Sequence, residues 1–172
     1  IGGGTIKLAL VREGEILSVA AFAVGGRLLA QDDQGRWTRI DDSARLVAES
    51  LGIEATPEAM ADQDNRIRIA HRMAQLVRDQ ITGMPLDTLG MDVLLTEPLE
   101  RIEPPSFISF SGGVSEYMFG NESRDFGDIA RMLAGEVVDQ IRQLPELNVV
   151  DAGQRIRATV IGASQFTVQV SG

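Results

Sequence analysis

Polar and apolar residues alternate roughly over residues 5–11, a pattern typical of a β-strand that is buried on one face. The alternation over residues 5–11 ends at a turn that contains Gly14, and a second strand is predicted over residues 16–24. A further hairpin is predicted over residues 28–40. We therefore expect the chain to begin as an antiparallel meander.

From Asp41 onward, apolar residues recur every three or four positions, which is the spacing of a helix with one buried face. The predicted helices cover residues 42–51, a short segment that begins at Pro57, residues 65–82 and residues 127–144. Gly52 and Gly83 follow two of these segments and favour a helix end there. The long helix over residues 65–82 is expected to pack against a sheet.

Two short apolar runs, residues 107–110 and 157–161, are typical of buried strands. Residues 84–105 mix prolines with an apolar run at residues 93–95, which fits a strand and a helix equally well. Strands interspersed with long helices predict an α/β fold with a mixed sheet and helices packed on it. Nothing in the sequence reads as an interdomain linker, so residues 1–172 are expected to form a single domain.

Charge and cysteine content argue against several classes of site. Sixteen Lys and Arg residues against 25 Asp and Glu residues give a net charge of −9, which argues against nucleic acid as a partner. The chain has no cysteine and a single histidine, so no zinc cluster is expected. No apolar run approaches the roughly 20 residues that span a bilayer, and the start is not signal-like, so we expect a cytoplasmic protein that does not bind membranes.

Three glycine-centred turns, at residues 1–5, 111–115 and 160–163, follow or adjoin strand-like runs. Glycine tolerates positive φ and has no side chain, so backbone N–H groups at such turns can approach a phosphate or a nucleotide base. The candidate nucleotide-binding residues are Gly2, Gly3, Gly4, Thr5, Gly112, Gly113 and Val114. The alternative is that such turns only shape the chain, and Gly25 and Gly26 are interpreted in that way, as a bend.

If the turns bind one nucleotide, residues 2–5 and 112–114 should face one cleft, with residues 160–163 supporting it from an adjacent strand. The Thr5 hydroxyl either donates to a phosphate oxygen or packs as a β-branched strand residue. We assign no catalytic residue and no metal ligand to the chain.

In their order and spacing, these turns resemble the second half of the actin-like ATPase superfamily, which has a ribonuclease H-like fold and includes heat-shock chaperones and sugar kinases. In that superfamily a Gly-Gly-Gly-Thr hairpin contacts the distal phosphates of the nucleotide, and a later Gly-Gly turn contacts the adenosine. Gly2 to Thr5 and Gly112 to Val114 match these motifs. With the strings at residues 24–29 and 157–163, the ordered set resembles the EutA family of reactivating factors for ethanolamine ammonia-lyase.

That resemblance implies an ATP-dependent, chaperone-like factor of ethanolamine utilization that releases damaged cobalamin from ethanolamine ammonia-lyase. It implies ATP and Mg²⁺ as cofactors of a longer parent protein and the lyase as a partner. Association with a bacterial microcompartment and a homo-oligomeric state are left open. The first phosphate loop of the superfamily, and the acidic residue that precedes the hairpin in family members, do not occur in residues 1–172. We therefore expect a C-terminal half that does not hydrolyse ATP by itself.

Two other functions within the same fold remain as alternatives: a small-molecule kinase, and a filament protein whose assembly is controlled by nucleotide. A kinase would consume ATP in step with a phosphorylated product, and a filament protein would pellet when nucleotide is added. A reactivating factor would do neither until a blocked lyase is supplied.

Overall fold

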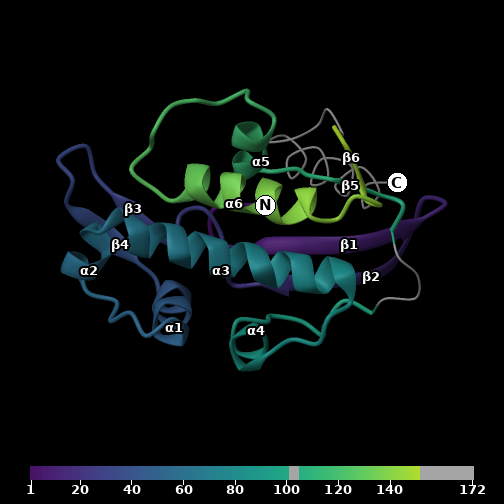
Figure 1. The fold of residues 1–172 in the computed structure, drawn as a ribbon, viewed down its shortest axis with the longest axis horizontal. Helices are drawn as coiled ribbons and strands as arrows, with labels where there is room; N and C mark the ends of the chain where they lie inside the picture. Colours follow the sequence, from purple (N-terminus) through teal and green to yellow (C-terminus); the bar gives the residue numbers. More distant parts are fainter. Residues whose placement is uncertain (101–104, 152–172) are drawn as a thin grey trace, which may run out of the picture.

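The computed structural model describes residues 1–100 and 105–151. Its strands are β1 (Ile6–Arg12), β2 (Glu15–Phe22), β3 (Leu29–Gln31), β4 (Trp37–Ile40), β5 (Phe107–Ser109) and β6 (Asn148–Val150) (Figure 1). Its helices are α1 (Asp42–Ser50), α2 (Pro57–Ala61), α3 (Gln63–Thr82), α4 (Thr88–Asp92), α5 (Gly113–Met118) and α6 (Ala130–Arg142). The strand predicted at residues 157–161 and the turn at residues 160–163 lie outside the described residues.

β1 and β2 form the antiparallel hairpin that the alternating pattern predicts, with Ile6 opposite Phe22. Glu13 and Gly14 at its tip have φ angles of 51° and 88°. Positive φ at both central residues is the geometry of the two-residue turn whose twist matches that of the flanking strands. The hairpin is tied to the core by its inner face, on which Ile6 and Phe22 are buried.

β3 and β4 form a second antiparallel hairpin in a sheet of its own. The single meander expected from the sequence is therefore divided into two hairpins. The division arises because the connection between β2 and β3 crosses the start of β1. There the N–H groups of Gly26 and Arg27 donate to the carbonyls of Gly2 and Gly3 at 3.1 and 2.7 Å.

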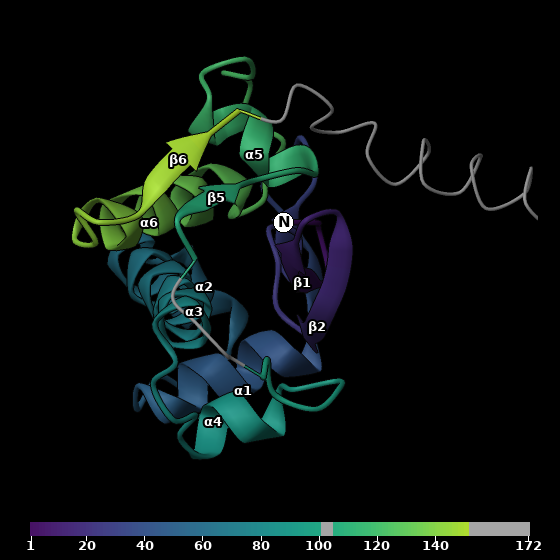
Figure 2. The same ribbon diagram turned by 90° about the vertical axis from the view of Figure 1, so that its right-hand side faces the viewer.

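α3 runs between α6 on one side and α1 and α4 on the other, with the β1–β2 hairpin alongside (Figures 1 and 2). It begins after Asp62, whose carboxylate accepts a hydrogen bond from the Asp64 N–H, and it ends at Gly83, which has a φ of 72°. The shorter α2 starts with Pro57, and the Thr56 hydroxyl caps it by accepting from the Ala59 N–H. These helix boundaries confirm the segments predicted from apolar spacing and capping residues.

The core lies where α3 meets α6, the inner face of the first hairpin and the smaller helices. Its fully buried large side chains are Phe22, Ile6, Leu29, Met60, Ile69, Met73, Leu76, Ile129, Leu133, Val24, Val47 and Val93. His71 of α3 meets Glu136 of α6 at 2.7 Å beside this contact. The His71 side chain is 44% exposed, so the pair lies at the surface edge of the contact between the two long helices.

The apolar run at residues 93–95, for which the sequence fits a helix and a strand equally well, is part helix end and part extended chain. Val93 ends α4, and the next residues approach the edge of β2. The Ala23 N–H donates to the Val93 carbonyl at 2.7 Å, and the Leu95 N–H donates to the Ala21 carbonyl at 2.8 Å. The segment therefore closes the outer edge of the first hairpin.

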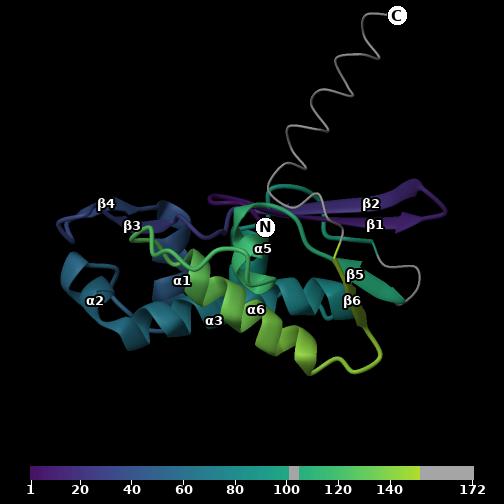
Figure 3. The same ribbon diagram turned by 90° about the horizontal axis from the view of Figure 1, so that it is seen from above.

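β5 and β6 pair in parallel, and α5 and α6 lie between them in the sequence. The sequence pattern predicts β5 but not β6. The expected mixture of strands and packed helices is present, although the described strands form three small sheets where one mixed sheet is expected (Figure 3). Among the described helices, none combines the length and the apolar character needed to cross a bilayer.

Candidate nucleotide site

Two of the three glycine turns meet at the start of β1, together with the Gly25-Gly26 segment. The N–H of Ile1 donates to the Ser111 carbonyl, and the N–H of Val114 donates to the Ile1 carbonyl at 3.3 Å. On the other side, Gly2 and Gly3 accept from the β2–β3 connection, as described above. The structure therefore brings residues 1–5 and 111–114 into contact, whereas their facing one cleft stays a prediction.

Gly112 is fitted closely to the start of the chain. Its φ is 95°, and a Cβ added there would lie 2.4 Å from the carbonyl oxygen of Ile1. Any side chain would have to push the two turns apart, because real Cβ atoms do not approach a backbone oxygen that closely. Glycine at this position is thus required by both the backbone conformation and the close approach.

Gly25 and Gly26, interpreted from the sequence as a bend, lie between the turns. A Cβ on Gly25 would lie 2.6 Å from the Gly3 carbonyl oxygen, and one on Gly26 would lie 2.7 Å from the Ala130 Cβ and 2.9 Å from a methyl carbon of Val114. The β2–β3 connection therefore joins the first turn to α5 and α6. From the sequence this segment is interpreted as a bend, and its contact with the first turn is not predicted. The only feature in the sequence that indicates such a close contact is the pair of adjacent glycines.

Several backbone donors at the turns have no partner within the described part of the chain. The Gly2 N–H is used locally, donating to the Thr5 carbonyl at 3.1 Å, whereas the N–H groups of Gly3, Gly4 and Gly113 make no hydrogen bond to described residues. Gly4 is exposed, and nothing lies within 4 Å of a Cβ built on it or on Gly113. These N–H groups are free to bind an acceptor on a ligand.

The remaining candidates differ in what they can contribute. Val114 is 2% exposed, and its N–H is already bonded to Ile1, so it holds the turns together and has no donor left for a ligand. Thr5 is half-buried, and its hydroxyl makes no hydrogen bond within the described residues. Both roles that the sequence allows for Thr5 therefore stay open.

Arg27 and Asp128 add charge to the site, and sequence reasoning did not select either of them. The Arg27 Nε lies 3.7 Å from the Asp128 Oδ2, and the two side chains are 66% and 6% exposed. Burial raises the pKa of the Asp128 carboxyl above its usual range, and the Ala130 N–H and the Arg27 guanidinium offset part of that rise. A buried carboxylate therefore lies behind an exposed guanidinium.

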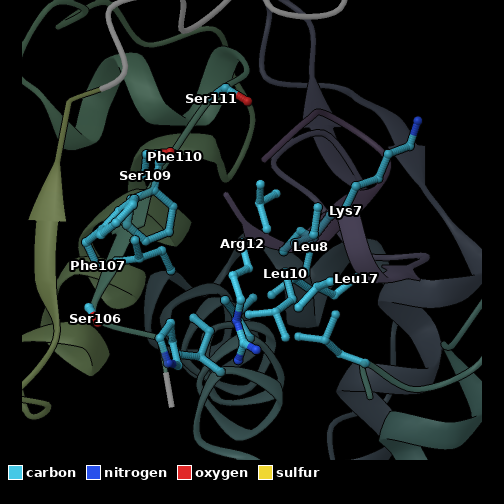
Figure 4. A pocket seen from close by; sticks show the side chains of 18 of the residues that line it. Lys7, Leu8, Leu10, Arg12, Leu17, Ser106, Phe107, Ser109, Phe110 and Ser111 are labelled. Carbon is cyan, nitrogen blue, oxygen red and sulfur yellow. The ribbon is translucent and has the colours of Figure 1, made fainter. Parts of the chain in front are cut away.

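A cavity of about 460 Å³ lies between β1 and β5. Ile1 and Ser111 belong to its lining, but residues 2–5 and 112–114 do not. Figure 4 shows Leu8, Leu10 and Leu17 facing Phe107 and Phe110 across the space, so its walls are mainly apolar. The candidate nucleotide site at the turns is distinct from this cavity.

No group of three or more His, Cys, Asp and Glu side chains in residues 1–100 and 105–151 is arranged to hold a metal ion.

Comparison with known proteins gives the family. The family model described as ethanolamine utilisation protein EutA matches residues 1–172. The chain belongs to the EutA family. The resemblance drawn from the four glycine-containing strings is thus confirmed.

Two curated EutA relatives match the whole of the chain. Both are named ethanolamine ammonia-lyase reactivase EutA: the protein of Salmonella typhimurium is 36% identical over 178 residues, and that of Escherichia coli is 34% identical over 175 residues. The chain spans 37% of the length of each. No solved structure matches it.

Proposed function

We propose that this chain is the nucleotide-binding half of an actin-like ATPase that reactivates ethanolamine ammonia-lyase. The observation that carries the proposal is the meeting of residues 1–5 with residues 111–114, which leaves free N–H groups on Gly3, Gly4 and Gly113. The name of the two EutA relatives, ethanolamine ammonia-lyase reactivase, supplies the partner. Because the chain spans 37% of those relatives, the activity belongs to the longer protein.

The residues present fit a nucleotide. Gly3 and Gly4 would donate N–H groups to phosphate oxygens, and Gly113 would donate its N–H to the nucleoside end. One nucleotide could reach both turns, because Ile1 holds the turns in contact. Mg²⁺ would neutralise negative charge on the phosphates. The phosphates themselves and parts of the protein outside this chain would hold the ion. ATP would supply the free energy of hydrolysis, while residues of this chain bind and orient it.

The hydrogen bonds around the turns give a path from the nucleotide to the rest of the domain. The segment of residues 25–27 bonds to Gly2 and Gly3, and the N–H of Ile129 donates to the Gly26 carbonyl at 3.1 Å. A ligand at the turns therefore touches elements that lead to β1, to β3 and to α6. Coupling to the lyase requires that the nucleotide states differ in their affinity for the blocked enzyme, which then loses its damaged cobalamin.

The test uses the full-length parent protein. Ethanolamine ammonia-lyase blocked by an inactive cobalamin is mixed with it, Mg-ATP and adenosylcobalamin are added, and ammonia release is followed. ATP-dependent recovery is the expected result. Absence of recovery with proteins that bind nucleotide would contradict the reactivating function, and a phosphorylated small molecule or a nucleotide-dependent pellet would point to a kinase or a filament protein.

A matched pair of variants links that activity to the site. Gly113 begins α5, where proline is tolerated, so Gly113→Pro removes one N–H, whereas Gly113→Ala keeps it and places its Cβ in open space. Loss of a hydrogen bond to the nucleotide is expected to weaken ATP binding by about five- to a hundredfold in G113P and by less than about twofold in G113A. Calorimetric titration measures both, and equal binding by the two variants would remove Gly113 from the site.

A further inference from the structure

Arg27 is held beside the first glycine turn by its backbone and by its side chain. Its N–H donates to the Gly3 carbonyl at 2.7 Å. A Cβ built on Gly3 would lie 3.3 Å from both Cγ and Cδ of Arg27, so the aliphatic part of the arginine covers the space where Gly3 has no side chain. The guanidinium is thereby carried to the edge of the turn whose Gly3 and Gly4 N–H groups are free.

Asp128 is fixed behind this arginine. Its Oδ1 accepts a hydrogen bond from the Ala130 N–H at 3.0 Å, and the next residue, Ile129, is bonded to the Gly26 carbonyl. The carboxylate therefore cannot move away without loosening the start of α6. Its second oxygen, Oδ2, faces the Arg27 Nε.

The contact between Arg27 and Asp128 leaves the guanidinium able to bind another anion. Its 3.7 Å separation is too long for a hydrogen bond. Among the described residues, the other arginine–carboxylate pairs are 3.1 Å or shorter, and two-thirds of the Arg27 side chain is exposed. Asp128 attracts the guanidinium without occupying its donors.

We infer that Arg27 is a phosphate-binding residue of the proposed nucleotide site and that Asp128 is the positioning residue that orients it. The inference rests on the proposed function. A guanidinium presents several donors in a plane that matches two phosphate oxygens, and it complements the single N–H donors of Gly3 and Gly4. Arg27 then recognises the charged part of the nucleotide, and the nucleoside is recognised elsewhere.

The experiment compares ATP, ADP and adenosine as ligands of the full-length parent protein by calorimetric titration. Arg27→Gln is expected to raise the dissociation constants of ATP and ADP by about ten- to a hundredfold, because charge-assisted hydrogen bonds are lost. The dissociation constant of adenosine is expected to stay within about twofold, which also reports that the variant is folded. Arg27→Lys, which keeps the charge but not the planar donors, should fall between R27Q and the wild type.

Arg39→Gln is the matched control, because Arg39 lies on β4 and pairs with Asp41 at 2.7 Å. It should leave all three dissociation constants unchanged. If the wild type binds ATP and R27Q binds it equally well, the inference is overturned while the proposed function stands. If the wild type binds none of the three ligands, the proposed function fails and the inference fails with it. An equal loss of adenosine and ATP would show that Arg27 only supports the fold.

Asp128→Asn tests the positioning role. If Asp128 acts by orienting Arg27, D128N weakens ATP binding in the wild-type background and has no further effect in the R27Q background. A carboxylate that merely repels phosphate predicts the opposite sign, since its removal would strengthen ATP binding. Tighter ATP binding by D128N, or an equal loss in both backgrounds, would therefore overturn the positioning role.

Discussion

Gly112 joins the second glycine turn to the start of the chain through a contact that leaves no room for a side chain. Its positive φ is a conformation that other residues adopt only with strain, and the Ile1 carbonyl lies where a Cβ would be. Gly120 provides a comparison, because it has a φ of 72° but nothing within 4 Å of a Cβ. Comparing substitutions at the two glycines therefore distinguishes the cost of backbone strain from the cost of the steric clash.

Gly112→Ala is expected to lower the free energy of unfolding by about 2–4 kcal/mol, because strain and a backbone clash act together. Gly120→Ala is expected to lower it by about 1–2 kcal/mol through strain alone. Urea denaturation of both variants measures the difference. Equal losses of unfolding free energy in the two variants would show that the turn at Gly112 moves away from Ile1 without further cost in stability.

Asp128 makes the stability of the domain depend on pH in an unusual direction for a carboxyl group. Its pKa is raised in the folded state, mainly by burial. A carboxyl with a folded pKa above its unfolded value stabilises the fold at pH values below the unfolded pKa, and this contribution is lost as the pH rises through the folded pKa. Asparagine at this position has no such dependence.

We therefore expect the stability of Asp128→Asn relative to the wild type to rise as the pH increases from about 3 to about 7. Urea denaturation at several pH values gives this difference directly, and effects of the other carboxyl groups cancel in it. Asp139→Asn, at a side chain that is 65% exposed, is the control for the loss of one negative charge. A relative stability that falls with pH would show that the attraction of Arg27 outweighs the burial of Asp128.

At the scale of elements, α3 and α6 pack against each other at the core, where the sequence predicts that the long helix packs against a sheet. Leu133 of α6 is fully buried, whereas Leu46 of α1 is 38% exposed. Leu133→Ala is expected to reduce the free energy of unfolding by about 2–5 kcal/mol through lost burial and a cavity. Leu46→Ala should reduce it by less than about 1 kcal/mol. Similar losses on urea denaturation would contradict the assignment of this contact as the core.

Local signals in the sequence predict most elements of this fold. The first hairpin follows from alternation and its glycine turn, and α3 follows from apolar spacing and the glycine at its end. The sequence pattern does not predict β6, because its three residues, Asn148–Val150, are all exposed and show no alternation of burial. The division of the meander escapes as well, because it depends on hydrogen bonds between residues 26–27 and 2–3, which no local pattern encodes.

The candidate site shows the same limit. The glycine strings indicate which turns can meet a ligand, and the structure brings two of those turns together. Arg27 and Asp128 are separated by about a hundred residues and carry no motif, so their proximity emerges only when the β2–β3 connection meets the start of α6. Sequence reasoning finds backbone sites that require glycine, whereas side chains gathered by tertiary contacts need the fold.

For the whole molecule, the three small sheets are held together by helices and by the loops that meet at the turns. The cavity lies between β1 of one sheet and β5 of another, and α3 lies below β5 in Figure 2. The residues that bond to one another around Ile1 link the segment before β1 to α5 and to the β2–β3 connection.

The bond between Ile1 and Ser111 closes a loop of 110 residues. Contacts that distant in sequence form late, since the entropy of loop closure is lost before they stabilise anything. We therefore expect the turns to assemble after the hairpins and the long helices. A nucleotide bound there would select completed domains from partly folded ones, and at a hundred times its dissociation constant it would add about 2.7 kcal/mol to their stability.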